Sequence, residues 1–211
     1  MRVRFLGHSS FVLETGNKKI LTDPFNEKLG YPVFQEPVDI ATISHDHWDH
    51  NAAEILARGT RVIRTAGIHS LEDIVVTGYP TFHDRSQGKE RGANIVFKIT
   101  AEGLNILHLG DLGEPLSAEQ IADWGPIDVL MIPVGSVYTI DAYEAAELAA
   151  RIAPAICIPM HFATPLLTFE LESLTNFTQQ FDTVLYKGDL RVTAGELPDS
   201  MQVVVLEYPD Q

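Results

Sequence analysis

The sequence has 211 residues, of which 45% are hydrophobic and 21% charged, and 15 Lys and Arg against 29 Asp and Glu give a net charge of −14. A globular domain is therefore expected, and so strong a negative field argues against nucleic acid and membrane as partners. Because Cys157 is the only cysteine, and neither a signal-peptide core nor an apolar run of roughly 20 residues is present, we expect a cytoplasmic protein without disulfides.

Strand patterns fill the first half of the chain. Short apolar and β-branched runs are separated by turn residues, as at Gly16–Lys19, where a hairpin turn is expected. The run Val38–Ser44 is mostly apolar, which is typical of a strand buried on both faces. In chain order, the strands predicted here are Arg2–Leu6, Phe11–Glu14, Ile20–Thr22, Val38–Ser44, Arg61–Arg64, Ile74–Thr77, Ala93–Thr100 and Leu104–Leu109.

Helices are predicted first at Asn51–Arg58, where Asn51 is a candidate N-cap and Gly59 a candidate C-terminal stop. Helices and strands alternate through the second half of the chain. The further helices predicted are Ser117–Asp123, Asp141–Arg151 and Phe169–Gln180, and the further strands are Ile127–Pro133, Ala155–Pro159, Thr183–Tyr186 and Gln202–Glu207. Strands followed by alternating helices and strands indicate a single α/β domain over residues 1–211, with helices covering the faces of a sheet.

The most informative segment is Ser44–His50, which reads His-x-His-x-Asp-His directly after a predicted buried strand. A loop leaving a strand can point alternate side chains into one cleft, so His45 and His47 could chelate one ion while Asp49 and His50 face a second. Imidazole and carboxylate together suit zinc, with iron and manganese as alternatives. A polar loop that leads into a helix is the competing interpretation. So dense a cluster of histidines, in a chain with 8 in total, favours metal binding.

Further candidate ligands follow other predicted strands. His83 comes after the apparent strand end Tyr79–Phe82, Asp111 comes shortly after Leu109, and His161 comes shortly after Pro159. The ends of strands are where open α/β sheets assemble their sites. We therefore expect these side chains to complete the coordination begun by the histidine motif.

This order of residues resembles the metallo-β-lactamase superfamily of binuclear metal hydrolases. The segments Gly7–Phe11, Thr22–Phe25, His108–Asp111 and Ile158–His161 are similar to a narrower group, which contains ascorbate-6-phosphate lactonase-like enzymes and small metal-dependent hydrolases. The resemblance implies a four-layer αβ/βα sandwich with its cleft along one edge between two sheets. The metal ligands that it implies are His45, His47 and His83 at one site, Asp49, His50 and His161 at a second, and Asp111 as the bridge.

The resemblance also implies an activity: a hydroxide held by two divalent metal ions, with zinc favoured and manganese or iron as alternatives, attacks a small ester, lactone or phosphoester. Asp49 would orient this nucleophile and take up its proton. We expect a small-molecule substrate, which could be anionic, and a homo-oligomer is an open alternative. The competing functions are a phosphodiesterase or nuclease of the same superfamily, a di-iron redox enzyme, which would typically carry Glu in place of His47, and a non-catalytic metal-stabilised binding protein.

Several polar residues are expected around this centre. His8 is predicted to contact substrate, take part in catalysis or support a ligand, with a purely structural role as the alternative. His108 is expected to hydrogen-bond either to a metal-binding side chain or within the core, and Asp23 either to a metal-binding imidazole or to the turn before Pro24. His69 has no supporting context and is expected at the surface.

The loop after His83 concentrates positive charge in an acidic chain, and it either binds an anionic substrate or forms a solvated connection. Tyr138, in another loop after a predicted strand, could line the same pocket. The three cations in the loop after His83 are Arg85, Lys89 and Arg91.

Overall fold

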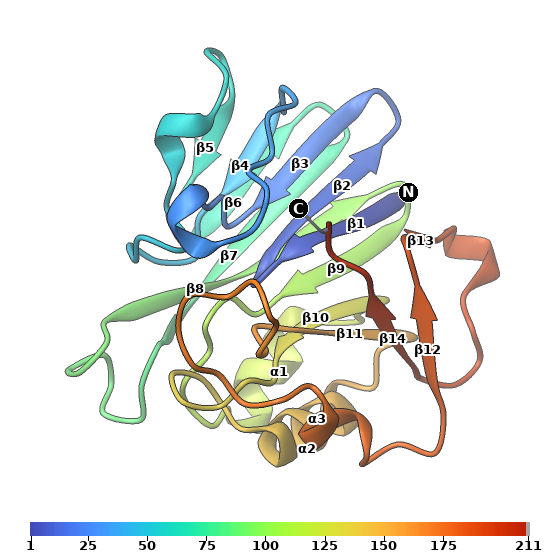
Figure 1. The fold of residues 1–211 in the computed structure, drawn as a ribbon. Coiled ribbons are helices and arrows are strands. Elements are labelled where there is room, and N and C mark those ends of the chain that lie inside the picture. Colours follow the sequence, from blue (N-terminus) through green and yellow to red (C-terminus); the bar gives the residue numbers. More distant parts are fainter. Residues whose placement is uncertain (210–211) are drawn as a thin grey trace.

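Two β-sheets packed face to face form the centre of the protein in the computed structural model, which describes residues 1–209 (Figure 1). The first sheet has six strands in the order β13-β1-β2-β3-β4-β5, and the second has eight in the order β12-β14-β11-β10-β9-β8-β7-β6. The strands of the first sheet are β1 (Arg2–Gly7), β2 (Ser10–Thr15), β3 (Lys18–Thr22), β4 (Ile40–Thr42), β5 (Arg61–Ile63) and β13 (Leu190–Arg191). Those of the second are β6 (Gly67–Leu71), β7 (Ile74–Phe82), β8 (Ala93–Ala101), β9 (Leu104–His108), β10 (Val129–Pro133), β11 (Ile156–Met160), β12 (Val184–Lys187) and β14 (Gln202–Leu206).

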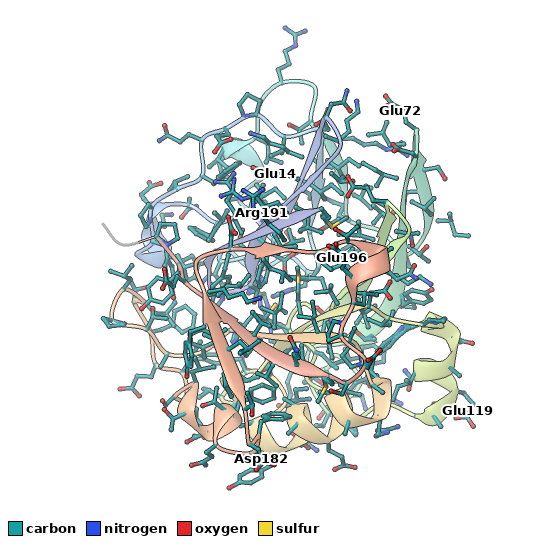
Figure 2. The ribbon with its side chains drawn as sticks, turned by 90° about the vertical axis from the view of Figure 1, so that its right-hand side faces the viewer. Glu14, Glu72, Glu119, Asp182, Arg191 and Glu196 are labelled. Atoms are coloured by element: carbon teal, nitrogen blue, oxygen red, sulfur yellow. The ribbon has the colours of Figure 1, made fainter. Side chains whose placement is uncertain are left out.

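The main core lies between the sheets. Alternate residues of β2, such as Phe11 and Leu13, point inward, as the two-residue period of a strand dictates, and share one buried cluster with Phe97 and Ile99 of β8. The acidic excess stays outside this core, with Glu72, Glu119 and Asp182 at the periphery of the molecule (Figure 2).

Three helices cover the outer face of the second sheet: α1 (Ala118–Trp124), α2 (Ala142–Ile152) and α3 (Thr175–Thr178) (Figure 1). The first two begin where the sequence predicts, because Ser117 with Gln120 and Asp141 with Glu144 form reciprocal capping boxes. None of the helices described within residues 1–209 has the length and apolar character needed to cross a bilayer.

The outer face of the first sheet is covered by a loop rather than by an α-helix. Leu6, Val12 and Leu21 point to this side and pack against the loop residues Phe25 and Leu29. The loop contains only a short 3-10 turn, η1 (Glu27–Leu29), and a second such turn, η2 (Ala53–Ile55), follows β4; a third, η3 (Ala194–Glu196), follows β13. The fourth layer of the sandwich is therefore present but is built mostly from loop.

The predicted helix Asn51–Arg58 is wrong, since the structure forms only η2 there. The expected N-cap residue is engaged elsewhere: the Asn51 amide donates to Asp46 and its carbonyl oxygen accepts from Arg64. The 3-10 turn has no side-chain cap at all. Tertiary hydrogen bonds have thus outweighed a local capping signal.

The predicted helix Phe169–Gln180 is also wrong over most of its length, because only α3 is helical. The preceding residues lie as a loop whose backbone pairs with its surroundings: Glu172 N donates to Gly135 O, and Ala163 N donates to Glu172 O. This pairing holds the loop beside the ends of β10 and β11.

Two strands were not predicted, β6 and β13, and β7 is longer than expected. β7 contains Pro80, which removes a backbone donor, but β6 pairs with β7 only as far as Gly78. Pro80 therefore lies where β7 has a single partner strand, β8, and the missing donor is tolerated.

Candidate metal centre

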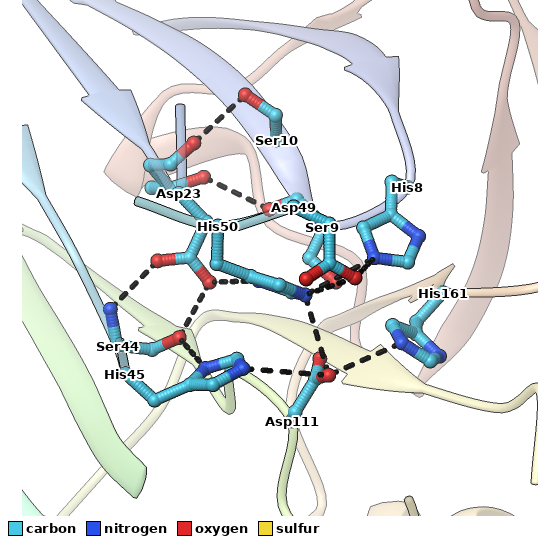
Figure 3. Close-up of polar contacts among 12 residues, drawn as sticks. His8, Ser9, Ser10, Asp23, Ser44, His45, Asp49, His50, Asp111 and His161 are labelled. Carbon is cyan, nitrogen blue, oxygen red and sulfur yellow. Dashed lines mark hydrogen bonds and ion pairs between the residues drawn. The ribbon is translucent and has the colours of Figure 1, made fainter. Parts of the chain in front are cut away.

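Histidine and aspartate side chains gather at the edge of the sandwich where strands of both sheets end (Figure 3). β3 and β4 run parallel in the first sheet, and β9, β10 and β11 run parallel in the second, so their carboxyl ends share one edge. The residues that follow these strands and β1 and β7 are His8, Asp23, His45, His47, Asp49, His50, His83, Asp111 and His161.

Backbone geometry helps to aim three of these side chains. His8, Asp23 and His161 have positive φ angles of 56°, 39° and 53°, which residues other than glycine rarely adopt. Two of them are tied together, since His161 N donates to His8 O at 2.7 Å. Strained conformations of this kind cluster at functional sites, where the surrounding structure enforces them.

His45, His47 and His83 form one group, in which one nitrogen of each ring lies within 4.8 Å of the others. The ring of His45 is 4.6 Å from that of His47 and 4.7 Å from that of His83, centroid to centroid. His45 Nε2 is buried and has no hydrogen-bond partner among residues 1–209. These are the three side chains expected to hold the first ion.

His8, His50 and His161 form a second group with ligand atoms within the same 4.8 Å. His8 Nε2 lies 3.1 Å from His50 Nε2 and 3.1 Å from Asp49 Oδ2. The structure thus brings together the expected set of Asp49, His50 and His161, and it adds His8 to them.

Asp111 lies between the two groups (Figure 3). Its Oδ2 atom is 3.2 Å from His83 Nε2 in the first group, and 3.2 Å from His161 Nε2 and 3.3 Å from His50 Nε2 in the second. Its Oδ1 atom is buried without a hydrogen-bond partner in the described part of the chain. One carboxylate therefore faces both sets of imidazoles.

The chemistry of these donors fits divalent cations. Burial lowers the pKa of His8 to about 4 and that of His45 to about 2, which keeps both imidazoles neutral. Burial alone would raise the pKa of Asp111, but the nearby His161 and His50 lower it by a larger amount, so the carboxylate is ionised. At His50 burial lowers the pKa, yet Asp111 and Asp23 raise it by more, so a cation would displace a proton there.

Asp23 and Ser44 fix the position of the Nδ1 proton in two candidate ligands, His50 and His45. Asp23 Oδ2 lies 2.9 Å from His50 Nδ1, and a carboxylate can only accept, so the proton is on Nδ1 and Nε2 faces the cluster. The Ser44 hydroxyl donates to Asp23 Oδ2 at 2.6 Å. It therefore accepts from His45 Nδ1 at 2.9 Å, and His45 Nε2 also keeps its lone pair for a ligand.

His108 contacts none of the candidate ligands through its side chain. Its Nε2 donates to Ser9 O at 2.8 Å and its Nδ1 accepts from Gly110 N at 3.2 Å. This buried imidazole ties the end of β9 to the β1–β2 turn, beside His8. His69 is half-buried in β6, and its ring contacts Thr65.

A cavity of about 380 Å³ opens beside the centre. Of the three predicted loop cations, only Arg91 lines it; Arg85 pairs with Glu144, and Lys89 is exposed outside the lining. The full lining is His47, Trp48, Asp49, His83, Arg91, Asp111, Tyr138, His161 and Phe169.

Sequence reasoning missed Asn94, Trp48 and Phe169. Asn94 is buried in β8, and its Oδ1 accepts from Asp111 N at 3.1 Å while its Nδ2 donates to Thr81 Oγ1 and Leu109 O. A polar amide at a fully buried position of an apolar strand was the signal that could have revealed it. For the two aromatic residues the sequence held no comparable signal, because their place in the cavity depends on loop conformation.

Comparison with known proteins identifies the family of this chain. Residues 2–161 match the family model of the β-lactamase superfamily domain. A UPF0173 metal-dependent hydrolase of Pyrococcus abyssi is 30% identical over 193 residues, which cover 78% of this chain and 85% of that protein. A crystal structure from Thermotoga maritima, described as a Zn-dependent hydrolase of the metallo-β-lactamase superfamily, has a TM-score of 0.84 and 36% identity and covers 99% of both chains.

A structure described as a metal-dependent hydrolase from Parabacteroides distasonis has a TM-score of 0.72 at 19% identity, covering 98% of this chain and 93% of that one, and so shares the fold. The matched segment, residues 2–161, runs from β1 to the end of β11 and includes every candidate ligand. The expected fold is thereby confirmed. This chain belongs to the β-lactamase superfamily, and it is a metal-dependent hydrolase.

Proposed function

We propose that the protein hydrolyses a small ester, lactone or phosphoester with the help of two divalent cations. The observation that carries this proposal is the position of Asp111, whose Oδ2 atom lies 3.2 Å from Nε2 atoms in both histidine groups. A carboxylate so placed can serve two cations at once. His45, His47 and His83 would hold one, and His50 and His161, with Asp49 and His8 beside them, would hold the other.

Divalent cations held by these residues would lower the pKa of water toward neutrality and would polarise a carbonyl or phosphoryl oxygen. The chain itself supplies orientation. Burial alone would raise the pKa of Asp49, but the hydrogen bond from His8 and the proximity of His50 lower it by a larger amount. This carboxylate is therefore ionised at neutral pH. Because Asp49 also lines the cavity, it can accept a hydrogen bond from the attacking water and receive its proton.

The donor set favours zinc, since most of the ligands are imidazole nitrogens, with manganese or iron as alternatives. The cavity lining supports a small substrate: within the described residues Arg91 is its only Lys or Arg. A nuclease would require a basic surface along its substrate, and the net charge of −14 opposes one.

Metal analysis joined to an activity screen tests the proposal. The wild-type protein, stripped with a chelator and reloaded with Zn²⁺, Mn²⁺ or Fe²⁺, should bind close to two ions per chain and hydrolyse a member of a panel of aryl esters, lactones and phosphodiesters. Asp111→Asn should lose at least one ion and most of the activity, whereas the control His69→Ala should keep both. Two retained ions in Asp111→Asn, or a single ion in the wild type, would contradict the binuclear arrangement.

A further inference from the structure

The cavity beside the metal centre combines a cation with three aromatic rings. Trp48, Tyr138 and Phe169 come from three separate loops, and Phe169 lies between the other two, with ring centroids 6.1 Å from Trp48 and 5.9 Å from Tyr138. Trp48 is 49% exposed, although it lies between two candidate ligands in the sequence. Exposed aromatic surface of this kind is typical of a place where a ligand packs.

Arg91 is the cation of this cavity, and its guanidinium lies over the Tyr138 ring, 4.4 Å from the ring centroid. The guanidinium makes no ion pair with any residue in the described part of the chain. Arg2, Arg4 and Arg85 pair with carboxylates, and Arg61, Arg64 and Arg151 donate to neutral oxygens, whereas the Arg91 guanidinium has neither kind of partner among residues 1–209. The hydrogen-bonding edge of Arg91 is therefore free to receive an anion from the cavity.

The backbone that carries Arg91 is held firmly in place. The Asp84 carboxylate, directly after His83, accepts hydrogen bonds from four backbone N–H groups, those of Ser86, Gly88, Glu90 and Arg91, at 2.7, 2.9, 3.0 and 2.7 Å. These bonds fold the loop back on itself and fix the main chain at Arg91. A pre-organised guanidinium loses less entropy when it binds a ligand than one on a mobile loop.

We propose that the substrate carries an anionic group, carboxylate or phosphate, which Arg91 binds, together with an apolar planar part that packs against Trp48 and Phe169. This inference rests on the proposed hydrolysis and specifies its substrate class. Its reacting bond would lie over Asp111, which lines the same cavity as Arg91 and Phe169. A volume of about 380 Å³ suits a molecule of this size.

The physical basis is the strength of charge-assisted hydrogen bonds. A guanidinium presents paired N–H donors that match a carboxylate or phosphate in geometry and charge. Because Arg91 is only half-buried, we expect a moderate effect of about a tenfold preference for the anion, which is about 1.4 kcal/mol.

A matched pair of esters tests this preference: 4-acetoxybenzoate, which is anionic, and 4-acetoxybenzamide, its neutral counterpart. On the metal-loaded wild type, kcat/KM should be about tenfold higher for the anion. Arg91→Met should bring the ratio of the two kcat/KM values close to one while its metal content stays at the wild-type level. The ratio for Arg91→Lys should lie between those of Arg91→Met and the wild type. Lys89→Met, which removes the same charge from the same loop outside the cavity, should keep the wild-type ratio.

A wild type without preference for the anion, or an unchanged ratio in Arg91→Met, would overturn the inference while leaving the hydrolytic function standing. If neither ester is hydrolysed, calorimetric binding of 4-hydroxybenzoate and 4-hydroxybenzamide decides between the same two outcomes: a preference lost in Arg91→Met supports the inference, and one retained overturns it. Phenylphosphonate as a third ligand distinguishes a phosphate group from a carboxylate.

Discussion

Asp23→Asn is the substitution that most directly tests how the centre is organised. Asp23 accepts three hydrogen bonds, from Ser44 N at 2.7 Å, from Ser44 Oγ at 2.6 Å and from His50 Nδ1 at 2.9 Å. An amide of the same shape can keep the bond from Ser44 N through its oxygen. It then presents an NH₂ group to His50 Nδ1, which must become an acceptor.

The tautomer of His50 should therefore reverse, with the proton on Nε2, the atom 3.3 Å from Asp111 Oδ2. In the wild type, loss of the Nε2 proton leaves a neutral imidazole whose remaining proton is on Nδ1, whereas in Asp23→Asn the neutral imidazole keeps its proton on Nε2 and has no lone pair there for a cation. Changes to such supporting residues typically weaken metal binding about 10- to 100-fold, which is about 1.4–2.8 kcal/mol. Cation affinity should fall most in the group that contains His50, and less in the group of His45, His47 and His83.

Competition against a fluorescent chelator measures the two affinities, and ¹⁵N NMR of the imidazoles reads the tautomer directly. Asp73→Asn, the same change at an exposed residue, is the control. Cation affinities within twofold of the wild type, with the His50 proton still on Nδ1, would refute the assignment of Asp23 as the residue that orients this ligand.

Other consequences of the structure can be measured in the same preparations. Burial raises the pKa of Cys157 to about 12, so at pH 8 its thiol stays protonated and should not react with Ellman's reagent until the protein is unfolded; rapid labelling of the native protein would contradict its burial. Removal of the metal by a chelator should lower the thermal midpoint, and the midpoint should rise again with added Zn²⁺, because a cation that binds only the folded state stabilises it; a midpoint independent of metal would count against a built site. Gly110→Ala should destabilise the protein by about 1–3 kcal/mol in urea titrations, because φ is +55° and a Cβ would lie 2.4 Å from Asn94 Oδ1. Gly195→Ala, where a Cβ meets nothing, should be close to neutral, and equal effects of the two would refute the steric argument.

The strands could be predicted where a continuous apolar run indicates burial on both faces. β10 and β11 are buried at every position, and their continuous apolar runs, Val129–Pro133 and Ile156–Met160, are typical of strands covered on both faces. Helix boundaries were predictable where a reciprocal capping box exists, as at Asp141. They failed at Asn51, because its side chain is bonded to Asp46 and Arg64, contacts that no local pattern contains.

The candidate site, too, could be predicted from the sequence only in part. A histidine motif after a buried strand could be recognised, because the ligands are close in sequence and the chemistry is specific to their residue types. The grouping of His8 with His50 could not, because it depends on the turn after β1, where His8 takes a φ of 56°. The position of Phe169 depended likewise on a loop that the sequence pattern presents as a helix.

Each histidine group takes members from both sheets: His45 and His47 follow β4 and His83 follows β7, whereas His50 follows β4 and His161 follows β11. Neither half of the sandwich can therefore assemble a complete coordination shell alone, so full loading comes after the sheets have docked. With the two proposed cations bound, separating the sheets would require their release, and metal dissociation would then slow unfolding. The proposed catalytic centre would then also be the place where the two sheets are held together.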